Sequence, residues 1–340
     1  MTDVAVAGNR SAWRGRLGAV PVAARPSLDA RRALQLILAA IWLLDGVLQY
    51  QGFMFTNGAN GFSGMLAGTA AGNPAIIAKP ITWDANLVDH HIVLLNAIFA
   101  TIQLLLGLGI AFRPTVRVAL AASVAWSVAV WWFGEGLGGV LNGGADPLSG
   151  APGAVIIYAL IAVLLWPADR PAAVAPFVAA RAVGVHVARA LWLVFWLSQA
   201  YFVLTPANRG PQAANGMITG MESGEPAWLQ GLMRGAASLT AQQGLATSIA
   251  LAGAFVLIAA GVYLPAAATK ATLVLAIAVS AAIWVFAQAL GGIIASGATD
   301  PNSGPLLILL ALAYWPARRA SPGTGPAPVP ATNAAGNLAG

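Results

Sequence analysis

A small set of acidic, imidazole and amide side chains stands out in a chain that has very few polar residues. Two imidazoles with one or two carboxylates form an adequate ligand set for zinc, iron or copper, and the same groups can relay protons to a quinone head group. We therefore predict a metal site formed by His90, His91, Glu135 and Asp45. The alternative is a cofactor site formed by Asp45, Asn96, Gln103 and Glu135.

Each of these residues also has a structural interpretation. Asp89, His90 and His91 would then form a solvated helix end, and Glu135 would be a charge at the membrane interface. Adjacent histidines on one helix diverge by about 100°, so only one of the pair is expected to face a helix bundle. Asn96 and Gln103 are seven residues apart on one helical face, where they would line the bundle or bond between helices.

The second half of the chain lacks these ionisable groups at the matching positions. Gln288 aligns with Glu135, and Gln242-Gln243 aligns with His90-His91. Asp45 falls opposite an apolar stretch near Phe195 and Trp196. The ionisable set is thus confined to the first half, which is where we expect a working site.

The alignment rests on a stretch that occurs twice. Residues 131–150 read "WWFGEGLGGVLNGGADPLSG" and residues 284–304 read "WVFAQALGGIIASGATDPNSG", with eleven identities in twenty positions when Thr299 is treated as an insertion. Trp166-Pro167 and Trp315-Pro316 extend the match. The sequence therefore predicts a tandem duplication in which both copies insert the same way up, as in parallel-repeat membrane proteins.

The repeated stretch is predicted to be a structural loop motif formed by Gly138, Gly139, Asp146, Pro147, Gly291, Gly292, Asp300 and Pro301. Asp is a good N-cap and Pro suits the first helical position, so each Asp-Pro pair is expected to start a helix. The glycines allow a tight turn and close helix packing. The alternative is a re-entrant segment whose helix N-terminus faces a ligand.

Composition sets the environment of these residues. With 59% hydrophobic and 8% charged residues, the chain has too little polar surface for a soluble globule. We predict an all-α integral membrane protein with eight transmembrane helices, arranged as two parallel four-helix repeats. The expected spans are 33–50, 91–111, 116–133, 148–166, 190–205, 244–263, 271–290 and 303–316.

The basic residues set the expected orientation. With both termini in the cytosol, 14 of the 17 Lys and Arg residues lie inside, as the positive-inside rule requires. This predicts a multi-pass protein of the plasma (inner) membrane and argues against nucleic-acid binding, which needs a clustered basic face. The absence of cysteine excludes disulfides and thiolate metal sites within the chain.

Five regions follow from this arrangement. A cytosolic N-terminal segment covers 1–30, and the two four-helix repeats cover 31–167 and 189–316. A cytosolic linker at 168–188 joins the repeats. The tail at 317–340 is rich in Pro, Gly and Ala and is expected to be a disordered cytosolic extension.

Each half resembles the DoxX/DoxD family of small four-helix membrane proteins. The resemblance rests on "RRALQLILAAIWLLDGVLQY", "GMLAGTAAGNPAIIAKPI" and "NAIFATIQLLLGLGIAFRP" before "GEGLGG". It implies a membrane subunit that supports redox chemistry at the outer face, with a quinone or transition metal as cofactor and an extracytoplasmic or membrane redox enzyme as partner. The alternatives are a small-solute transporter and a structural anchor for a partner enzyme.

Overall fold

The computed structural model of the protein describes residues 29–168, 175–295 and 297–317, and every regular element within these ranges is helical. The prediction of an all-α protein is confirmed for this part of the chain. The N-terminal segment up to residue 28, the linker residues 169–174 and the tail from residue 318 lie outside it. Within the predicted linker, the short helix α7 (Val178–Val183) is an element that the sequence did not suggest.

Each of the eight predicted spans overlaps a helix, but the helices differ greatly in length. In the first half these are α1 (Ala30–Leu48), α4 (Ile92–Ala111), α5 (Val116–Phe133) and α6 (Ala154–Leu164). In the second half they are α8 (Val185–Val203), α11 (Gly244–Gly261), α12 (Ala266–Phe286) and α13 (Ser303–Ala313). Two hairpins of shorter helices precede α4 and α11, namely α2 (Phe62–Gly68) with α3 (Ala75–His90) and α9 (Ala213–Gly220) with α10 (Ala227–Thr240).

Within the described ranges, four helices are long and apolar enough to cross a membrane: α4, α5 with its preceding turn, α11 and α12. Their outward faces carry exposed apolar side chains such as Leu94, Leu105, Ile249 and Leu257. Such surfaces are costly in water and indicate a lipid bilayer environment. This supports the prediction of a membrane protein, and the number of helices with the required length and composition is four.

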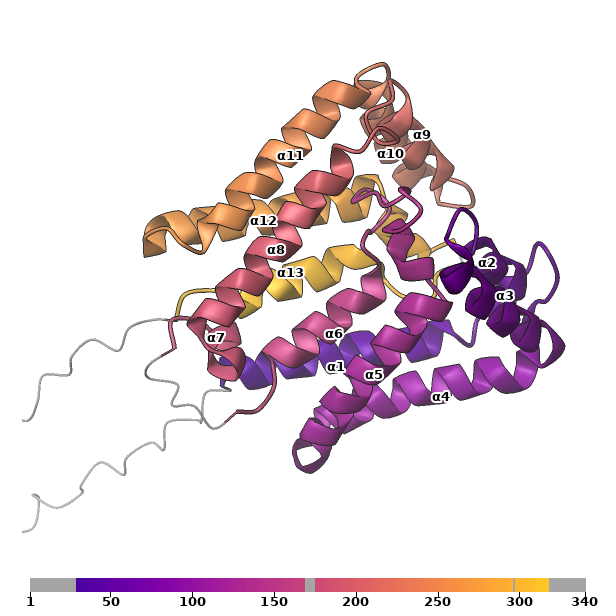
Figure 1. The fold of residues 1–340 in the computed structure, drawn as a ribbon, viewed down its shortest axis with the longest axis horizontal. Coiled ribbons are helices and arrows are strands. Elements are labelled where there is room, and N and C mark those ends of the chain that lie inside the picture. The colour runs from indigo at the N-terminus through magenta and orange to yellow at the C-terminus, as the bar shows by residue number, and fades with distance from the viewer. Residues whose placement is uncertain (1–28, 169–174, 296, 318–340) are drawn as a thin grey trace, which may run out of the picture.

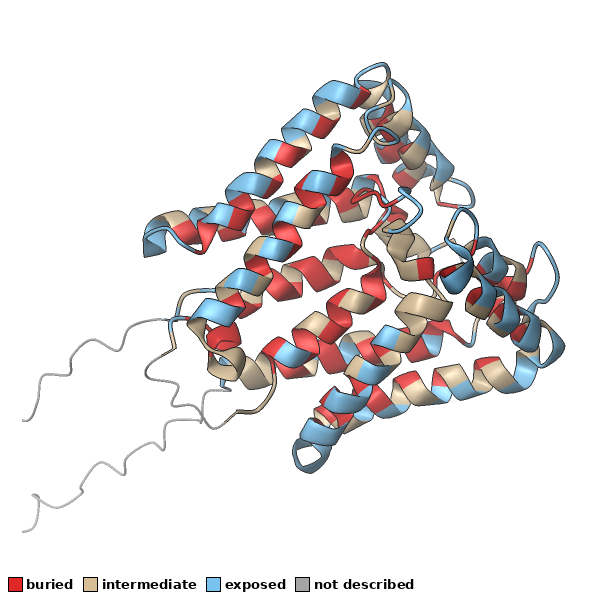
Figure 2. Cartoon of the chain, viewed as in Figure 1, coloured by how far each residue is buried: buried red, intermediate tan, exposed pale blue. Residues whose placement is uncertain are grey.

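The short helices α6 and α13 form the centre of the molecule. Each has 11 residues, or roughly 16 Å at 1.5 Å per residue, against about 30 Å of hydrocarbon. They contact each other, and most of their residues are buried (Figure 2). Because a helix that is apolar all round is buried in protein or lipid, these two runs owe their composition to the protein core.

The longer helices are arranged around this centre (Figure 1). In the first half α1 packs on α4, α4 on α5 and α5 on α6, and in the second half α8, α11, α12 and α13 pack in the same order. Helix α13 also contacts α1. The second half therefore reaches the part of the first half that contains Asp45.

Arginines secure one end of the first-half bundle. Arg31 donates to the carbonyls of Trp166 and Ala168, and Arg32 donates to those of Ile110 and Ala111. These carbonyls lie at or just beyond the C-terminal ends of α6 and α4, where the helix dipole favours a positive charge. The cationic end of the bundle is thus built from side chains that the charge pattern assigns to the cytosol.

The two glycine-rich loops have closely similar backbones. Leu137 and Gly138 have φ values of 57° and 61°, and Leu290 and Gly291 have φ values of 56° and 78°. In each loop a tryptophan Nε1 donates to a proline carbonyl: Trp131 to Pro152 at 2.6 Å and Trp284 to Pro301 at 2.8 Å. In the first loop, Pro152 therefore occupies the position that Pro301 has in the second. The sequence alignment instead matched Pro301 with Pro147, five residues earlier.

The predicted capping role of the Asp-Pro pairs is wrong. Helix α6 begins at Ala154 after Gly153, and α13 begins at Ser303 after Asn302, whose side chain accepts from the Ser303 amide. Asp146 and Asp300 instead accept from the amides two residues ahead, at 2.9 and 2.6 Å, which closes local turns. The left-handed conformations of Gly150 and Gly153 keep the first loop non-helical well past Pro147.

Candidate functional site

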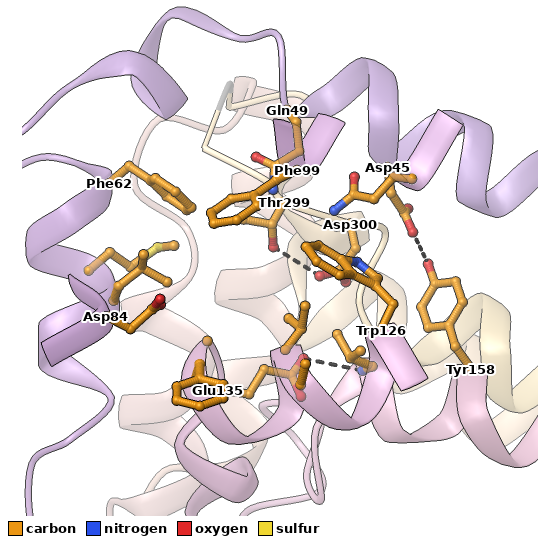
Figure 3. Close-up of a pocket in the computed structure, with 18 of the residues that line it drawn as sticks. Asp45, Gln49, Phe62, Asp84, Phe99, Trp126, Glu135, Tyr158, Thr299 and Asp300 are labelled. Atoms are coloured by element: carbon orange, nitrogen blue, oxygen red, sulfur yellow. Dashed lines mark hydrogen bonds between the residues drawn. The ribbon is translucent and has the colours of Figure 1, made fainter. Parts of the chain in front are cut away.

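A pocket of about 270 Å³ lies between α1, α4, α5 and α6. Phe62 from α2 and Asp84 from α3 lie on one side of it, and Thr299 and Asp300 from the loop before α13 lie on another (Figure 3). Its wall is mainly apolar and aromatic, with six aromatic side chains: Trp42, Phe62, Phe99, Trp126, Phe133 and Tyr158. The pocket therefore combines stacking surfaces with a few polar groups, as ligand sites generally do.

Asp45 is the most deeply placed acid of this pocket, with 2% of its surface exposed. The Tyr158 hydroxyl donates to its Oδ2 at 2.5 Å (Figure 3). Its other oxygen, Oδ1, is buried and has no hydrogen-bond partner among the residues that the structure describes. An unsatisfied buried carboxyl oxygen is costly, and this one lies on a side chain that lines the pocket.

Four further side chains of the pocket wall carry a buried polar atom without a partner. The acceptors are Oε1 of Gln49 and Oε1 of Gln103, and the donor is Nε1 of Trp126. The fourth is Oε2 of Glu135, which accepts when the carboxyl is ionised and donates when it is protonated. Buried polar groups are rarely left unsatisfied, so this group of unpaired atoms calls for a hydrogen-bonding occupant of the pocket, either a ligand or ordered water.

Glu135 is positioned by the glycine-rich loop that follows α5. Its Oε1 accepts from the backbone amide of Val155, in the first turn of α6, at 3.2 Å. A Cβ on Gly153 would lie 2.1 Å from Oε2 of Glu135, so only glycine at that position leaves room for this side chain. At the matching position of the second loop, Gln288 donates to Ser303 Oγ at the start of α13.

Asp300 is the site residue that sequence reasoning placed in the wrong role. It was predicted to be a helix cap because it aligns with Asp146, yet it lines the first-half pocket and Asp146 does not. The sequence signal that could have revealed this is the second proline, Pro152, five residues after Pro147. When Pro301 is matched with Pro152, Asp300 aligns with Ala151 and has no acidic counterpart in the first half. Tyr158 was also missed, although it is the only polar side chain in the run AVIIYALIAVL.

The predicted metal ligands are not brought together. Asp45 and Glu135 line the pocket, but His90 and His91 are exposed at the junction of α3 and α4, and His90 borders a separate shallow cavity with Asp89. No three His, Asp or Glu side chains in the described ranges are placed to hold a metal ion. The predicted metal site does not form, because His90 and His91 lie at the C-terminal end of α3, which packs outside the four-helix bundle.

The two predicted amides have different roles. Gln103 lines the pocket, as the sequence suggested. Asn96 is fully buried, and its Nδ2 donates to the backbone carbonyl of Gln49 at 2.7 Å, which ties α4 to the end of α1. Asn96 therefore follows the second of its two interpretations, bonding between helices.

Burial raises the pKa of Glu135 from 4.5 to about 8, with a smaller contribution from the nearby charge of Asp300. Burial also raises the pKa of Asp300. No Lys, Arg or His side chain lines the pocket in the described part of the chain to oppose these shifts. At neutral pH the Glu135 carboxyl is thus mainly protonated when the pocket is empty.

This shift predicts a pH dependence of stability. Between about pH 4.5 and 8 the folded protein retains a proton on Glu135 that the unfolded chain has lost, so the free energy of unfolding falls as pH rises through that window and then levels off. We expect Glu135→Gln to reduce this fall, measured as the change in thermal unfolding midpoint between pH 6 and 8.5 in detergent. Glu222→Gln, which alters a carboxylate paired with Arg234 outside the pocket, should keep the parental slope; equal slopes in all three proteins would contradict the shift.

Comparison with known proteins adds no relative to this geometry. No protein family, no curated protein and no solved structure matches the chain. The chemistry of the site therefore rests on its own residues.

Proposed function

We propose that the protein is a membrane subunit that binds a quinol or quinone head group in the pocket of its first half and supports redox chemistry with a partner enzyme. The observation that carries this proposal is the group of unpaired polar atoms inside an aromatic pocket. A quinol has two hydroxyl donors, which can satisfy two of the three unpaired acceptors, Asp45 Oδ1, Gln49 Oε1 and Gln103 Oε1. Its flat ring suits the surrounding aromatic side chains.

Other features support this proposal over a metal site. The pocket holds carboxyl and amide groups without the histidines, and it is bounded by α4 and α5, two helices long and apolar enough to cross a membrane, which suits a membrane-soluble ligand. The resemblance of each half to DoxX/DoxD proteins implies the same kind of redox support. An extracytoplasmic or membrane redox enzyme remains the expected partner.

The ligand is tested with menadiol, menadione and the 1,4-dimethoxy analogue of menadiol, by anaerobic titration calorimetry of the protein in mild detergent. We expect menadiol to bind at least tenfold more tightly than menadione, because most of the unpaired atoms are acceptors, and the dimethoxy analogue to bind worst. Solvent extraction of the purified protein should also recover endogenous quinone. Equal affinity for all three probes would overturn the quinol proposal.

Tandem duplication and a parallel arrangement of the two halves are part of the same proposal. They are supported by the matched order of helix packing and by the similar glycine-loop backbones. In this arrangement all eight helices, including the short α6 and α13, belong to two four-helix units with the same orientation. The second unit would then act as scaffold and contribute Asp300 to the first.

The proposed topology has cytosolic termini, with the 51–89, 134–147, 206–243 and 291–302 segments on the outer face. Because the natural chain has no cysteine, single cysteines at Thr56, Asn215 and Ser321 can be labelled without background. We expect a membrane-impermeant maleimide to label Thr56→Cys and Asn215→Cys in intact cells, and Ser321→Cys only after lysis. Labelling of Ser321→Cys in intact cells would reverse the orientation.

A transporter for a small organic cation is the second candidate. The observation that favours it is the combination of carboxyl groups and aromatic rings without any basic side chain in the pocket wall, which attracts cations. Counterflow of tetramethylammonium in proteoliposomes, absent in Asp45→Asn vesicles, would favour this candidate over the quinol subunit.

A further inference from the structure

A second cavity of about 360 Å³ lies beside the pocket. It is bordered mainly by the glycine-rich loop 138–153 and by Thr299, Asp300 and Asn302. It is more polar and more open than the pocket, and two residues that border it, Gly144 and Ser149, are exposed at the surface. This cavity, which we call the vestibule, therefore provides a place for water at the glycine-loop face.

Three residues line both the vestibule and the pocket: Glu135, Thr299 and Asp300. Glu135 is held by the Val155 amide, and its unpaired Oε2 remains available. Asp300 accepts from the Asn302 amide at 2.6 Å and from the Thr299 hydroxyl at 2.9 Å. Glu135 and Asp300, which Figure 3 labels in the pocket, therefore form part of the partition between the aromatic pocket and the more open polar cavity.

The partition is built from both halves of the chain. Glu135 belongs to the first half and Asp300 to the second, and the Asn302 amide Nδ2 donates to the Ser149 carbonyl at 3.3 Å across the two loops. A Cβ on Gly150 would lie 2.2 Å from Oδ1 of Asn302. The close approach of the loops thus depends on glycine at 150, and it places the two carboxyl groups in one wall.

We propose that Glu135 and Asp300 exchange protons between the ligand pocket and the water of the vestibule. In each transfer an O–H bond to the donor breaks and one to the acceptor forms. A proton of the bound ligand's hydroxyl passes to the ionised Glu135 carboxylate and leaves the ligand oxygen as an anion. The protonated Glu135 then passes the proton to the ionised Asp300 carboxylate, which releases it to the water of the vestibule. The titratable groups that face Glu135 from the surrounding elements are Asp45 on α1, Asp84 on α3, Tyr158 on α6 and Asp300. The identity of the proton-bearing ligand rests on the proposed function, whereas the route to water is a property of the empty protein.

The raised pKa of Glu135, about 8, suits this role. A proton carrier works best when its pKa lies near the ambient pH, because both protonation states are then populated. Gln288, the counterpart in the second half, carries an amide that does not act as a proton acceptor and donor at neutral pH. This explains why the route would be confined to the first half.

The test is hydrogen–deuterium exchange of the Glu135 carboxyl, followed by infrared spectroscopy of the ligand-free protein at pH 7. Its protonated C=O band is identified as the band that Glu135→Gln removes. A cysteine replaces Ser149, which is exposed and lines the vestibule, and is modified with a bulky maleimide; Ser238→Cys, exposed on α10 away from the vestibule, is the matched control.

We expect the Glu135 band to shift in deuterium oxide within seconds in the parent and in the modified Ser238→Cys protein. Modified Ser149→Cys and unmodified Asp300→Asn should exchange at least tenfold more slowly. Parental exchange rates in both proteins, or the absence of a protonated Glu135 band at pH 7, would overturn the proposal. Because no ligand is present, a protein that passes this test yet binds no menadiol would refute the quinol function and retain the proton route.

Discussion

Asp45→Asn is expected to weaken menadiol binding about 10- to 100-fold. A buried hydrogen-bonding group that loses its partner costs about 1–3 kcal/mol, and each 1.4 kcal/mol corresponds to a factor of ten in affinity. The variant has nearly the same volume, and its remaining carbonyl oxygen can still accept from the Tyr158 hydroxyl, as Oδ2 of Asp45 does in the parent. The amide then presents an N–H group where the ligand requires an acceptor.

Asp146→Asn is the matched control for this experiment. Asp146 is also buried and also belongs to the first half, but its Oδ1 accepts from the Leu148 amide and it does not line the pocket. We expect it to leave the dissociation constant for menadiol within threefold of the parental value. Parental affinity in Asp45→Asn, with an unchanged thermal unfolding midpoint, would remove Asp45 from the site.

Tyr158→Phe distinguishes the roles of the two carboxyl oxygens of Asp45. It removes the hydroxyl that donates to Oδ2 and leaves Oδ1 in place. We expect a smaller loss of menadiol affinity than in Asp45→Asn, because the acceptor that faces the ligand is retained. An effect as large as that of Asp45→Asn would instead mean that Tyr158 contacts the ligand itself.

Gly138→Ala is expected to cause the largest loss of stability among single substitutions in the loops. A Cβ at this position would lie 1.8 Å from the Pro152 carbonyl oxygen, and Gly138 has a φ of 61°. The obstructing atom belongs to the backbone, so the 150–153 segment itself must move. That movement would disturb the hydrogen bond from Trp131 to Pro152 and the position of Glu135 beside Gly153.

Gly143→Ala isolates the backbone cost from the steric one. Gly143 also has a positive φ, 78°, but a Cβ there meets no atom within 4 Å. Both variants therefore lose roughly 1–2 kcal/mol from the left-handed conformation, and Gly138→Ala loses about 1–3 kcal/mol more from overpacking. Differential scanning calorimetry in detergent should show a markedly lower unfolding midpoint for Gly138→Ala, and equal midpoints would contradict the close approach of the two loop segments.

The sequence by itself determined the helical class, indicated the membrane environment and located the two glycine-rich turns, although it misplaced the helix starts that follow them. Long apolar runs dictate helices because a backbone in lipid must satisfy its own hydrogen bonds. Glycines at 138 and 291 occupy left-handed positions in both loops because other residues are strained there. These are properties of short segments, so short-range patterns suffice to predict them.

Only the tertiary structure decided which residues share the pocket. Tyr158 and Asp45 meet although 113 positions separate them, and Asp300 reaches the first half because α13 packs against α1. Helical periodicity shows which side chains share a face, but it does not name the helix opposite that face. His90 and His91 illustrate the same limit. Imidazole is a good metal ligand, but α3 packs outside the bundle, so both histidines are exposed and lie apart from Asp45.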